Sequence, residues 1–209
     1  MEVIDKKQQI IQTAERLFAS SGFDGTSVRD IAEQAGVNLA MISYYFGSKL
    51  KLMEAIFEER SSNIKARVES LLQNSELDPL QKMEMLVEEY VDRVMEKQQF
   101  FKIMICEQVV NKNHVIIQLI NDLKLKNAET ITRLIKDGQK KGAFKKNIDV
   151  ILMMSTMMGT LTQIIISQDY YREFNNLQSL TSEQFITHMK KKLKTHIKTI
   201  FKEILVYEG

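Results

Sequence analysis

The scarcity of helix-breaking residues is the feature that most constrains this fold. The 209 residues contain one proline and eight glycines, whereas a sandwich of short strands needs many turns. Apolar residues recur at helical spacing, and between residues 4 and 20 they lie at i, i+1, i+4, i+7 and i+8. The sequence therefore predicts an all-α chain of about nine helices, at residues 4–20, 27–35, 38–45, 48–73, 79–97, 99–110, 113–140, 147–168 and 181–206.

Residues that form disulfides and metal sites are few. Cys106 is the single cysteine, and the three histidines are His114, His188 and His196, so we expect no disulfide framework, no metal site and no cofactor. The sequence has no phosphate-binding glycine-rich loop, no His-Glu-x-x-His and no Gly-x-Ser-x-Gly motif, so we do not expect an enzyme. The charged first residues do not resemble a secretory signal, and the reducing cytoplasm is the expected compartment.

One apolar stretch is long enough to be considered as a membrane span. Residues 150–168 carry no charge over 19 positions, close to the roughly 20 that a bilayer requires. Serine, threonine, glycine and glutamine interrupt the stretch at eight positions, and the chain has no tryptophan. A membrane span remains the alternative, but the pattern favours a helix buried in a core or an interface. We therefore expect no membrane partner.

Residues 27–46 have the pattern of a helix-turn-helix. Apolar residues have the spacing of two short helices on either side of Gly36, which can adopt the positive φ of a tight turn. Ala32 is small where the helices must approach closely, and Asn38 is a good N-cap for the second helix. In such a motif the second helix lies in the major groove of DNA, with its N-terminal residues facing the bases. Taken alone, the pattern is also typical of an ordinary helical corner.

The flanking sequence is more specific than the motif. From Lys7 to Glu58 the chain resembles the N-terminal domain of the tetracycline-repressor-like (TetR/AcrR) transcriptional regulators, in the residues Ala14-x-x-Leu17-Phe18, Gly22-Phe23, Thr26, Ile31-Ala32, Ala35-Gly36-Val37, Ile42, Tyr45-Phe46 and Ser48-Lys49. The resemblance implies a DNA-binding domain at residues 4–64, built of three helices around the motif, and a larger helical domain for effector binding and dimerisation at residues 65–209.

Two positions depart from the family's usual pattern. Ser43 stands where tyrosine is more common, and Leu50 replaces a commonly acidic residue. Ser43 leaves open which aromatic ring contacts the sugar-phosphate backbone, for which Tyr44 and Tyr45 are both available.

Net charge gives the N-terminal domain little help in binding DNA. Residues 1–60 contain seven basic and nine acidic side chains, and the predicted recognition helix has none. We expect basic side chains and helix N-termini to face phosphates, and apolar and hydroxyl groups to read the bases. For Lys49, phosphate contact is favoured over a solvated position because it follows the Ser48 cap. The predicted DNA contacts are Lys6, Lys7, Thr26, Ser27, Arg29, Asn38, Leu39, Ala40, Ser43, Tyr44, Tyr45 and Lys49.

The last two predicted helices have wide apolar faces. Ser155, Gly159 and Thr162 lie along one side of the first of them and allow another helix to approach closely. A chain with one recognition helix needs a second copy to read a two-fold operator. We therefore expect a homodimer through helices 147–168 and 181–206, with an intramolecular core as the alternative. The lysines of the last helix are expected to be mostly a solvated rim, at Lys190, Lys191, Lys192, Lys194, Lys198 and Lys202.

Twelve methionines are many for a chain of this length. Methionine adapts its shape and can line cavities for varied apolar ligands, although a row of methionines at helical spacing is also typical of plain core. The family resemblance implies a small apolar effector in a cavity among the central helices. The residues expected to line it are Tyr90, Phe100, Phe101, Met104, Met153 and Met157. The long helix from Ser48 would connect this cavity to the recognition helix.

Together with these patterns, the family resemblance implies a cytoplasmic homodimeric transcriptional regulator, most simply a repressor. It would bind a pseudo-palindromic operator in double-stranded DNA and leave it when a small hydrophobic effector binds. The alternative is an all-α ligand-binding or interaction protein whose N-terminal module does not bind DNA specifically. The uncharged recognition helix keeps that alternative open, and the salt dependence of DNA binding separates the two.

Overall fold

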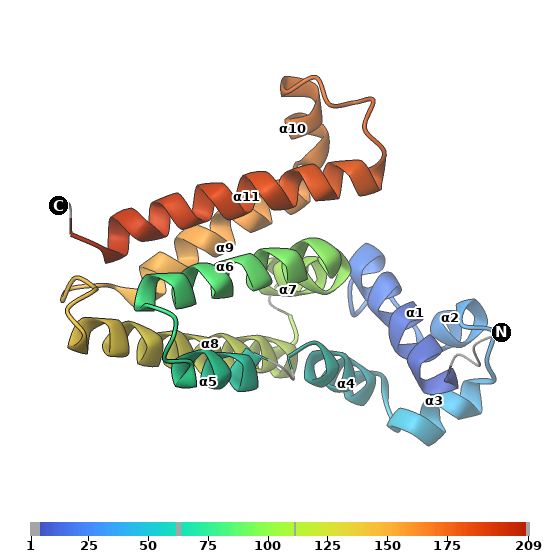
Figure 1. Cartoon of the computed structure of the whole chain (residues 1–209). Helices are drawn as coiled ribbons and strands as arrows, with labels where there is room; N and C mark the ends of the chain where they lie inside the picture. Colours follow the sequence, from blue (N-terminus) through green and yellow to red (C-terminus); the bar gives the residue numbers. More distant parts are fainter. Residues whose placement is uncertain (1–4, 62–63, 111, 208–209) are drawn as a thin grey trace. The chain divides into compact units, whose positions relative to one another are not determined.

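Every regular element of the described chain is a helix. The computed structural model describes residues 5–61, 64–110 and 112–207, and within them no strand occurs. The all-α class is therefore confirmed. The helices, drawn in chain order in Figure 1, are α1 (Lys6–Ser21), α2 (Val28–Gln34), α3 (Leu39–Phe46), α4 (Lys49–Ser61), α5 (Ile64–Gln73), α6 (Pro79–Glu96), α7 (Gln98–Val110), α8 (His114–Lys140), α9 (Val150–Ile166), α10 (Gln168–Phe174) and α11 (Ser182–Leu205).

Side-chain caps explain where several helices begin. Ser27, Asp78 and Thr181 each accept a hydrogen bond from the backbone N–H three residues on, and the side chain at that third position accepts one from the cap's own N–H. This reciprocal pair satisfies two backbone donors at each helix start. Pro79 follows Asp78 in the first turn of α6, where the missing N–H costs nothing.

Two details of the predicted helices are corrected, and two others involve residues outside the described ranges. The helix predicted at 147–168 begins at Val150, because Asp149 is its N-cap, and ends at Ile166. The segment after it, for which no helix was predicted, contains α10. The single helix predicted at 48–73 is described as α4 and α5, and residues 62 and 63 between them lie outside the described residues. Residue 4, where the first helix was expected to begin, also lies outside them.

The chain divides into two compact units. The first comprises residues up to 63 together with residues 99–123, and the second comprises residues 64–98 together with those from 124 onward. The first unit contains α1 to α4, α7 and the start of α8, and its core includes Phe18, Ile31, Ile42, Leu52 and Ile56, each 2% exposed or less. One boundary falls next to the predicted one at residue 64, but residues 99–123 group with the N-terminal helices.

In the second unit α11 packs along α6 and also contacts α9 (Figure 1). The contact is an apolar seam in which every fourth residue of α11 is buried. These buried residues are Phe185, Met189, Leu193, Ile197, Phe201 and Leu205.

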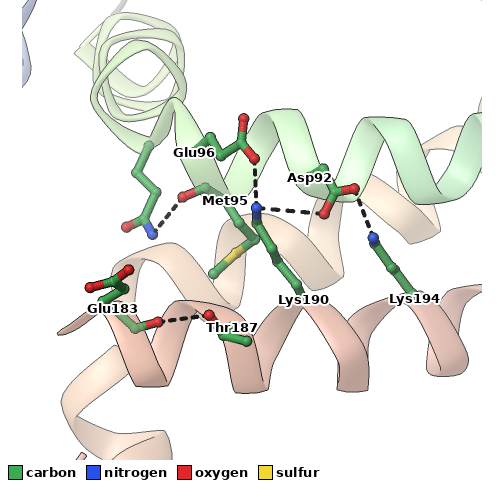
Figure 2. Close-up of polar contacts among 8 residues, drawn as sticks. Asp92, Met95, Glu96, Glu183, Thr187, Lys190 and Lys194 are labelled. Atoms are coloured by element: carbon green, nitrogen blue, oxygen red, sulfur yellow. Dashed lines mark hydrogen bonds and ion pairs between the residues drawn. The ribbon is translucent and has the colours of Figure 1, made fainter. Parts of the chain in front are cut away.

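Three lysines of α11 pair with carboxylates of α6 beside this seam. The Nζ of Lys190 lies 2.6 Å from Glu96 and 3.6 Å from Asp92, and the Nζ of Lys194 lies 2.7 Å from Asp92 (Figure 2). Lys198 pairs with Glu88 at 2.6 Å. The hydrogen bond to Glu96 raises the pKa of Lys190 above its ordinary value. Half of the lysines predicted to be a solvated rim thus form a ladder of partly exposed ion pairs, each worth little to stability but together favouring one register of α11 on α6.

The apolar stretch considered as a membrane span forms α9 and the start of α10. Among the described residues, no single helix has the length and apolar composition to cross a membrane. Helices α9 and α10 meet the two criteria only when taken together, and the chain bends by 81° between them.

Candidate nucleic-acid interface and apolar cavity

Helices α2 and α3 form a helix-turn-helix with its turn and its core in place. Gly36 has φ = 60°, and the N–H of Val37 donates to the carbonyl of Ala32 at 3.0 Å. The side chain of Asn38 then accepts from the N–H of Ala40 at 2.9 Å and begins α3. Ile31 and Ile42 are buried at 0% and 2% exposure and anchor the two helices on the core of the first unit. The turn therefore fixes which face of α3 is directed outward.

The outward face of α3 is apolar, aromatic and hydroxylic. Tyr44 is 84% exposed and Leu39 is 40% exposed, although both are residues that folded chains tend to cover. The Tyr44 ring meets the half-buried Tyr45 ring edge-on, with 5.1 Å between centroids. The other predicted contacts that the structure leaves exposed are Lys6, Lys7, Ser27, Arg29, Asn38, Ala40 and Ser43.

Ser27 is also the N-cap of α2. Its hydroxyl accepts from the N–H of Asp30 at 3.1 Å, and its own N–H donates to the Asp30 carboxylate at 2.8 Å. The Ser27 hydroxyl, and next its N–H, lower the pKa of Asp30 below its ordinary value. The start of α2 is thus exposed, and the Asp30 carboxylate is bound to a backbone N–H there.

Thr26 and Lys49 lie differently from the other predicted DNA contacts. Thr26 is 2% exposed, and its hydroxyl donates to the carbonyl of Gly22 at 2.9 Å. The Nζ of Lys49 donates to the carbonyls of Phe23 and Thr26 at 2.8 and 2.9 Å and lies 4.2 Å from the centre of the Phe23 ring. Both polar groups are therefore engaged with the turn between α1 and α2.

An apolar cavity of about 60 Å³ lies in the second unit, between α5, α6, α8, α9 and α11. Of the residues predicted for an effector, Tyr90, Met153 and Met157 line it. Phe100, Phe101 and Met104 do not, because they are on α7 in the first unit, where the Phe100 ring packs 5.0 Å from that of Phe57. The lining residues not anticipated from the sequence are Val68, Met83, Leu86, Val87, Asn127, Ile131, Met154 and Phe201.

Two polar side chains enter this apolar lining. Asn127 is one, and the other is Tyr90, whose hydroxyl lies 2.7 Å from the sulfur of Met158. Burial raises the pKa of the Tyr90 hydroxyl well above its ordinary value, so the group stays protonated and is a hydrogen-bond donor throughout the neutral range. A thioether sulfur is a weak acceptor for such a donor.

Helix α9 has one face that the described chain leaves open. Ile151, Leu152 and Ile166 are 58%, 66% and 59% exposed. Gly159 lies between them in the helix, and a Cβ atom placed on it would meet no atom within 4 Å. Of the small residues predicted on this side, Ser155 and Gly159 are exposed and Thr162 is half-buried.

A buried acidic residue, Glu107, was not anticipated from the sequence. Its carboxyl accepts a hydrogen bond from the backbone N–H of Phe23 at 3.0 Å, and the side chain is on α7 in the same unit as the helix-turn-helix. The sequence did indicate its burial, because one helix face is formed by Phe100, Ile103, Met104 and Glu107. An acid buried on such a face needs a hydrogen-bond or charge partner. No group of three or more metal-ligating side chains occurs among the described residues.

Comparison with known proteins agrees with this geometry. The family described as "Bacterial regulatory proteins, tetR family" matches residues 10–56, and the "Tetracyclin repressor-like, C-terminal domain" matches residues 79–197. The chain is 25% identical to the probable acrEF/envCD operon repressor of Escherichia coli (strain K12). That match extends over 167 residues and covers 78% of this chain and 76% of that protein. It is also 52% identical to the probable HTH-type transcriptional regulator YttP of Bacillus subtilis (strain 168). That match extends over 56 residues, which are 27% of this chain and 27% of that protein.

A solved structure extends the similarity of fold to the whole chain. The ketosteroid transcriptional regulator KstR2 of Mycobacterium tuberculosis superposes with a TM-score of 0.69 at 17% identity, covering 99% of this chain and 98% of that one. The helix-turn-helix, the helical C-terminal region and both family matches lead to one assignment: this chain belongs to the TetR family of bacterial regulators, and it is a DNA-binding transcriptional regulator with a ligand-binding domain.

Proposed function

We propose that this regulator is a dimeric repressor that reads a pseudo-palindromic operator with the outward face of α3 and leaves it when a small apolar effector binds. TetR-family regulators bind operator DNA, act as dimers and bind small-molecule effectors. The observation that carries the proposal is the 84% exposure of Tyr44, which lies on the side of α3 opposite the buried Ile42. Because the chromosome is in the cytoplasm, we propose that compartment as its place of action.

Within this proposal the predicted DNA contacts divide into two groups. The exposed residues on and around α2 and α3 contact DNA, with Lys6, Lys7, Arg29 and Tyr44 facing phosphates and the other exposed α3 residues facing the groove. Thr26 and Lys49 instead hold the turn before α2, since their polar groups donate to backbone carbonyls there. The phosphate contact first expected of Lys49 would have to use the third N–H of its ammonium, since the other two donate to these carbonyls.

The cavity supports an effector that is mostly apolar with one hydrogen-bonding oxygen. An oxygen acceptor beside Tyr90 would be a stronger partner for the hydroxyl than the sulfur of Met158. The cavity of about 60 Å³ is far smaller than the roughly 300–1,000 Å³ of ordinary ligand sites. Binding therefore requires the methionines of the lining to change rotamer, which their unbranched side chains allow. A small apolar cavity without effector and an enlarged one with it are the two states that a switch requires.

Tyr44→Ala tests the proposed DNA face. We expect it to weaken operator binding about tenfold, the order of one hydrogen bond to a charged phosphate, and to do so for all DNA sequences alike. The melting temperature should stay unchanged, because the side chain is 84% exposed. Affinity is measured by fluorescence anisotropy on a duplex that the wild-type chain selects from a random library.

Tyr170→Ala is the matched control, since this tyrosine is also on a helix and 67% exposed, but on α10 in the second unit. It should leave the affinity unchanged. If Tyr44→Ala and Tyr170→Ala bind equally well, α3 is not the DNA-reading helix. If the wild-type chain selects no preferred sequence and binds DNA only weakly and with high salt sensitivity, the specific-regulator proposal gives way to a ligand-binding protein with a non-reading N-terminal module.

A further inference from the structure

Helix α7 carries a carboxyl group in a core position. Phe100, Ile103 and Met104 form its buried face, and Glu107 follows one turn later on the same face at only 7% exposure. A carboxyl group is costly to bury unless hydrogen bonds compensate it. Methionine or leucine would fill this position without that cost. The hydrogen-bond partner of the carboxyl group should therefore explain why an acid is found here.

The partner of Glu107 is a backbone group in the turn that leads into the helix-turn-helix. Its Oε1 accepts from the N–H of Phe23 at 3.0 Å, across 84 residues of sequence. Phe23 is itself 7% exposed, so water cannot readily replace the carboxyl group. The carbonyl of the same residue accepts from the Nζ of Lys49 at 2.8 Å. One residue of the turn is thus held from both sides, by α7 through its N–H and by α4 through its C=O.

The direction of α2 depends on this turn. The turn comprises residues 22–26, and the Ser27 cap of α2 follows immediately. Thr26 makes two further hydrogen bonds at this turn. Its hydroxyl donates to the carbonyl of Gly22, and its own carbonyl accepts from the Lys49 ammonium. A shift of Phe23 would therefore move the start of α2, and with it α3 beyond the tight turn at Gly36.

We propose that Glu107 is a positioning residue for DNA reading, which holds the turn before α2 from α7 and so sets the orientation of α3. The inference rests on the proposed function. It assigns Glu107 no contact with DNA. Its effect is transmitted through the backbone of Phe23.

Three variants test it. Glu107→Met removes the acceptor with little change of shape, and Glu107→Gln keeps an acceptor oxygen at the same distance from the backbone. Ile103→Ala is a control that removes apolar volume from the same buried face of α7 and leaves the hydrogen bond of Glu107 to Phe23 in place. The first readout is hydrogen exchange of the Phe23 amide. The second is affinity, per folded molecule, for the duplex selected by the wild-type chain.

We expect Glu107→Met to speed exchange of the Phe23 amide and to weaken operator binding, each by roughly 10- to 100-fold, as the loss of a hydrogen bond to a charged acceptor predicts. Glu107→Gln should restore most of both. Ile103→Ala should lower the melting temperature while leaving operator affinity within about twofold of wild type, a difference under 0.5 kcal/mol. Should Glu107→Met not fold, Glu107→Asp takes its place, because the shorter side chain withdraws the oxygen from the Phe23 N–H.

The inference is overturned if Glu107→Met binds the duplex as tightly as Ile103→Ala, or if Glu107→Gln restores neither readout. Failure of the proposed function looks different, because the wild-type chain then selects no duplex at all. In that case the exchange measurement alone decides whether Glu107 holds the turn.

Discussion

The variant Gly159→Arg is expected to be a folded monomer with almost no affinity for the operator. Within one chain the substitution is harmless, since a Cβ atom at this position would meet nothing within 4 Å. Glycine also has a lower helix propensity than arginine by roughly 0.5–1 kcal/mol, so α9 should become slightly more stable. In the proposed dimer the same face of α9 packs closely against the partner, and a long cationic side chain there is both too large and unpaired.

The loss of operator affinity should be large. A monomer reaches one half-site only, and specific binding by dimeric regulators typically exceeds non-specific binding by about 10³- to 10⁷-fold. We expect a loss of at least about 10³-fold. Analytical ultracentrifugation measures the assembly and anisotropy measures the affinity. Gly159→Ala should remain dimeric, and Ser70→Arg, on an exposed position of α5, should bind like wild type. A Gly159→Arg protein that sediments as a dimer would remove α9 from the interface.

The second large effect concerns the switch. An effector found by thermal-shift screening of small apolar compounds should lower operator affinity by roughly 5- to 150-fold, the range of coupling energies of about 1–3 kcal/mol. Linkage then requires that saturating operator DNA weaken effector binding by the same factor. The two factors come from anisotropy with and without effector and from calorimetry with and without DNA. Equal effector affinities in the two calorimetric experiments would show that the cavity does not communicate with DNA binding.

Met157→Trp links this coupling to the cavity of the second unit. Met157 is 8% exposed and lines the cavity, so a larger ring should occupy the space and abolish the response to effector while the protein stays dimeric. Leu125→Trp is the control, since Leu125 is 59% exposed on α8 and does not line the cavity. If Met157→Trp binds and responds to the effector as wild type does, the cavity is ordinary core and the effector binds elsewhere.

Helices that depend on local sequence patterns could be predicted, whereas a helix held by tertiary contacts could not. Long helices such as α6 and α11 are readable because their apolar stripe repeats over several turns and their caps are local. Helix α10 has seven residues, too few for a stripe, and it is held by contacts beyond its own sequence. Arg172 donates to the carbonyls of Leu177 and Leu180 and lies 3.9 Å from the centre of the Phe185 ring.

The candidate sites show the same division. The exposed face of α3 follows from local signals, the turn at Gly36 and the cap at Asn38, so its residues could be listed in advance. The roles of Thr26 and Lys49 could not be predicted, because a hydroxyl or an ammonium group can donate equally well to a phosphate or to a backbone carbonyl. Likewise, Phe100 and Met104 have an apolar spacing that predicts burial but does not say against which unit. Only the tertiary packing puts Phe100 beside Phe57 and puts Met153 and Met157 at the cavity.

Hydroxyl-radical footprinting on the selected duplex tests the central claim, two-fold reading of DNA by α3, most directly. We expect two protected patches related by a two-fold axis, with centres about one helical turn, roughly 34–36 Å, or a multiple of it apart. Both patches should weaken together in Tyr44→Ala and disappear in Gly159→Arg. A single unsymmetrical patch bound by a monomer, or uniform protection without sequence preference, would contradict it.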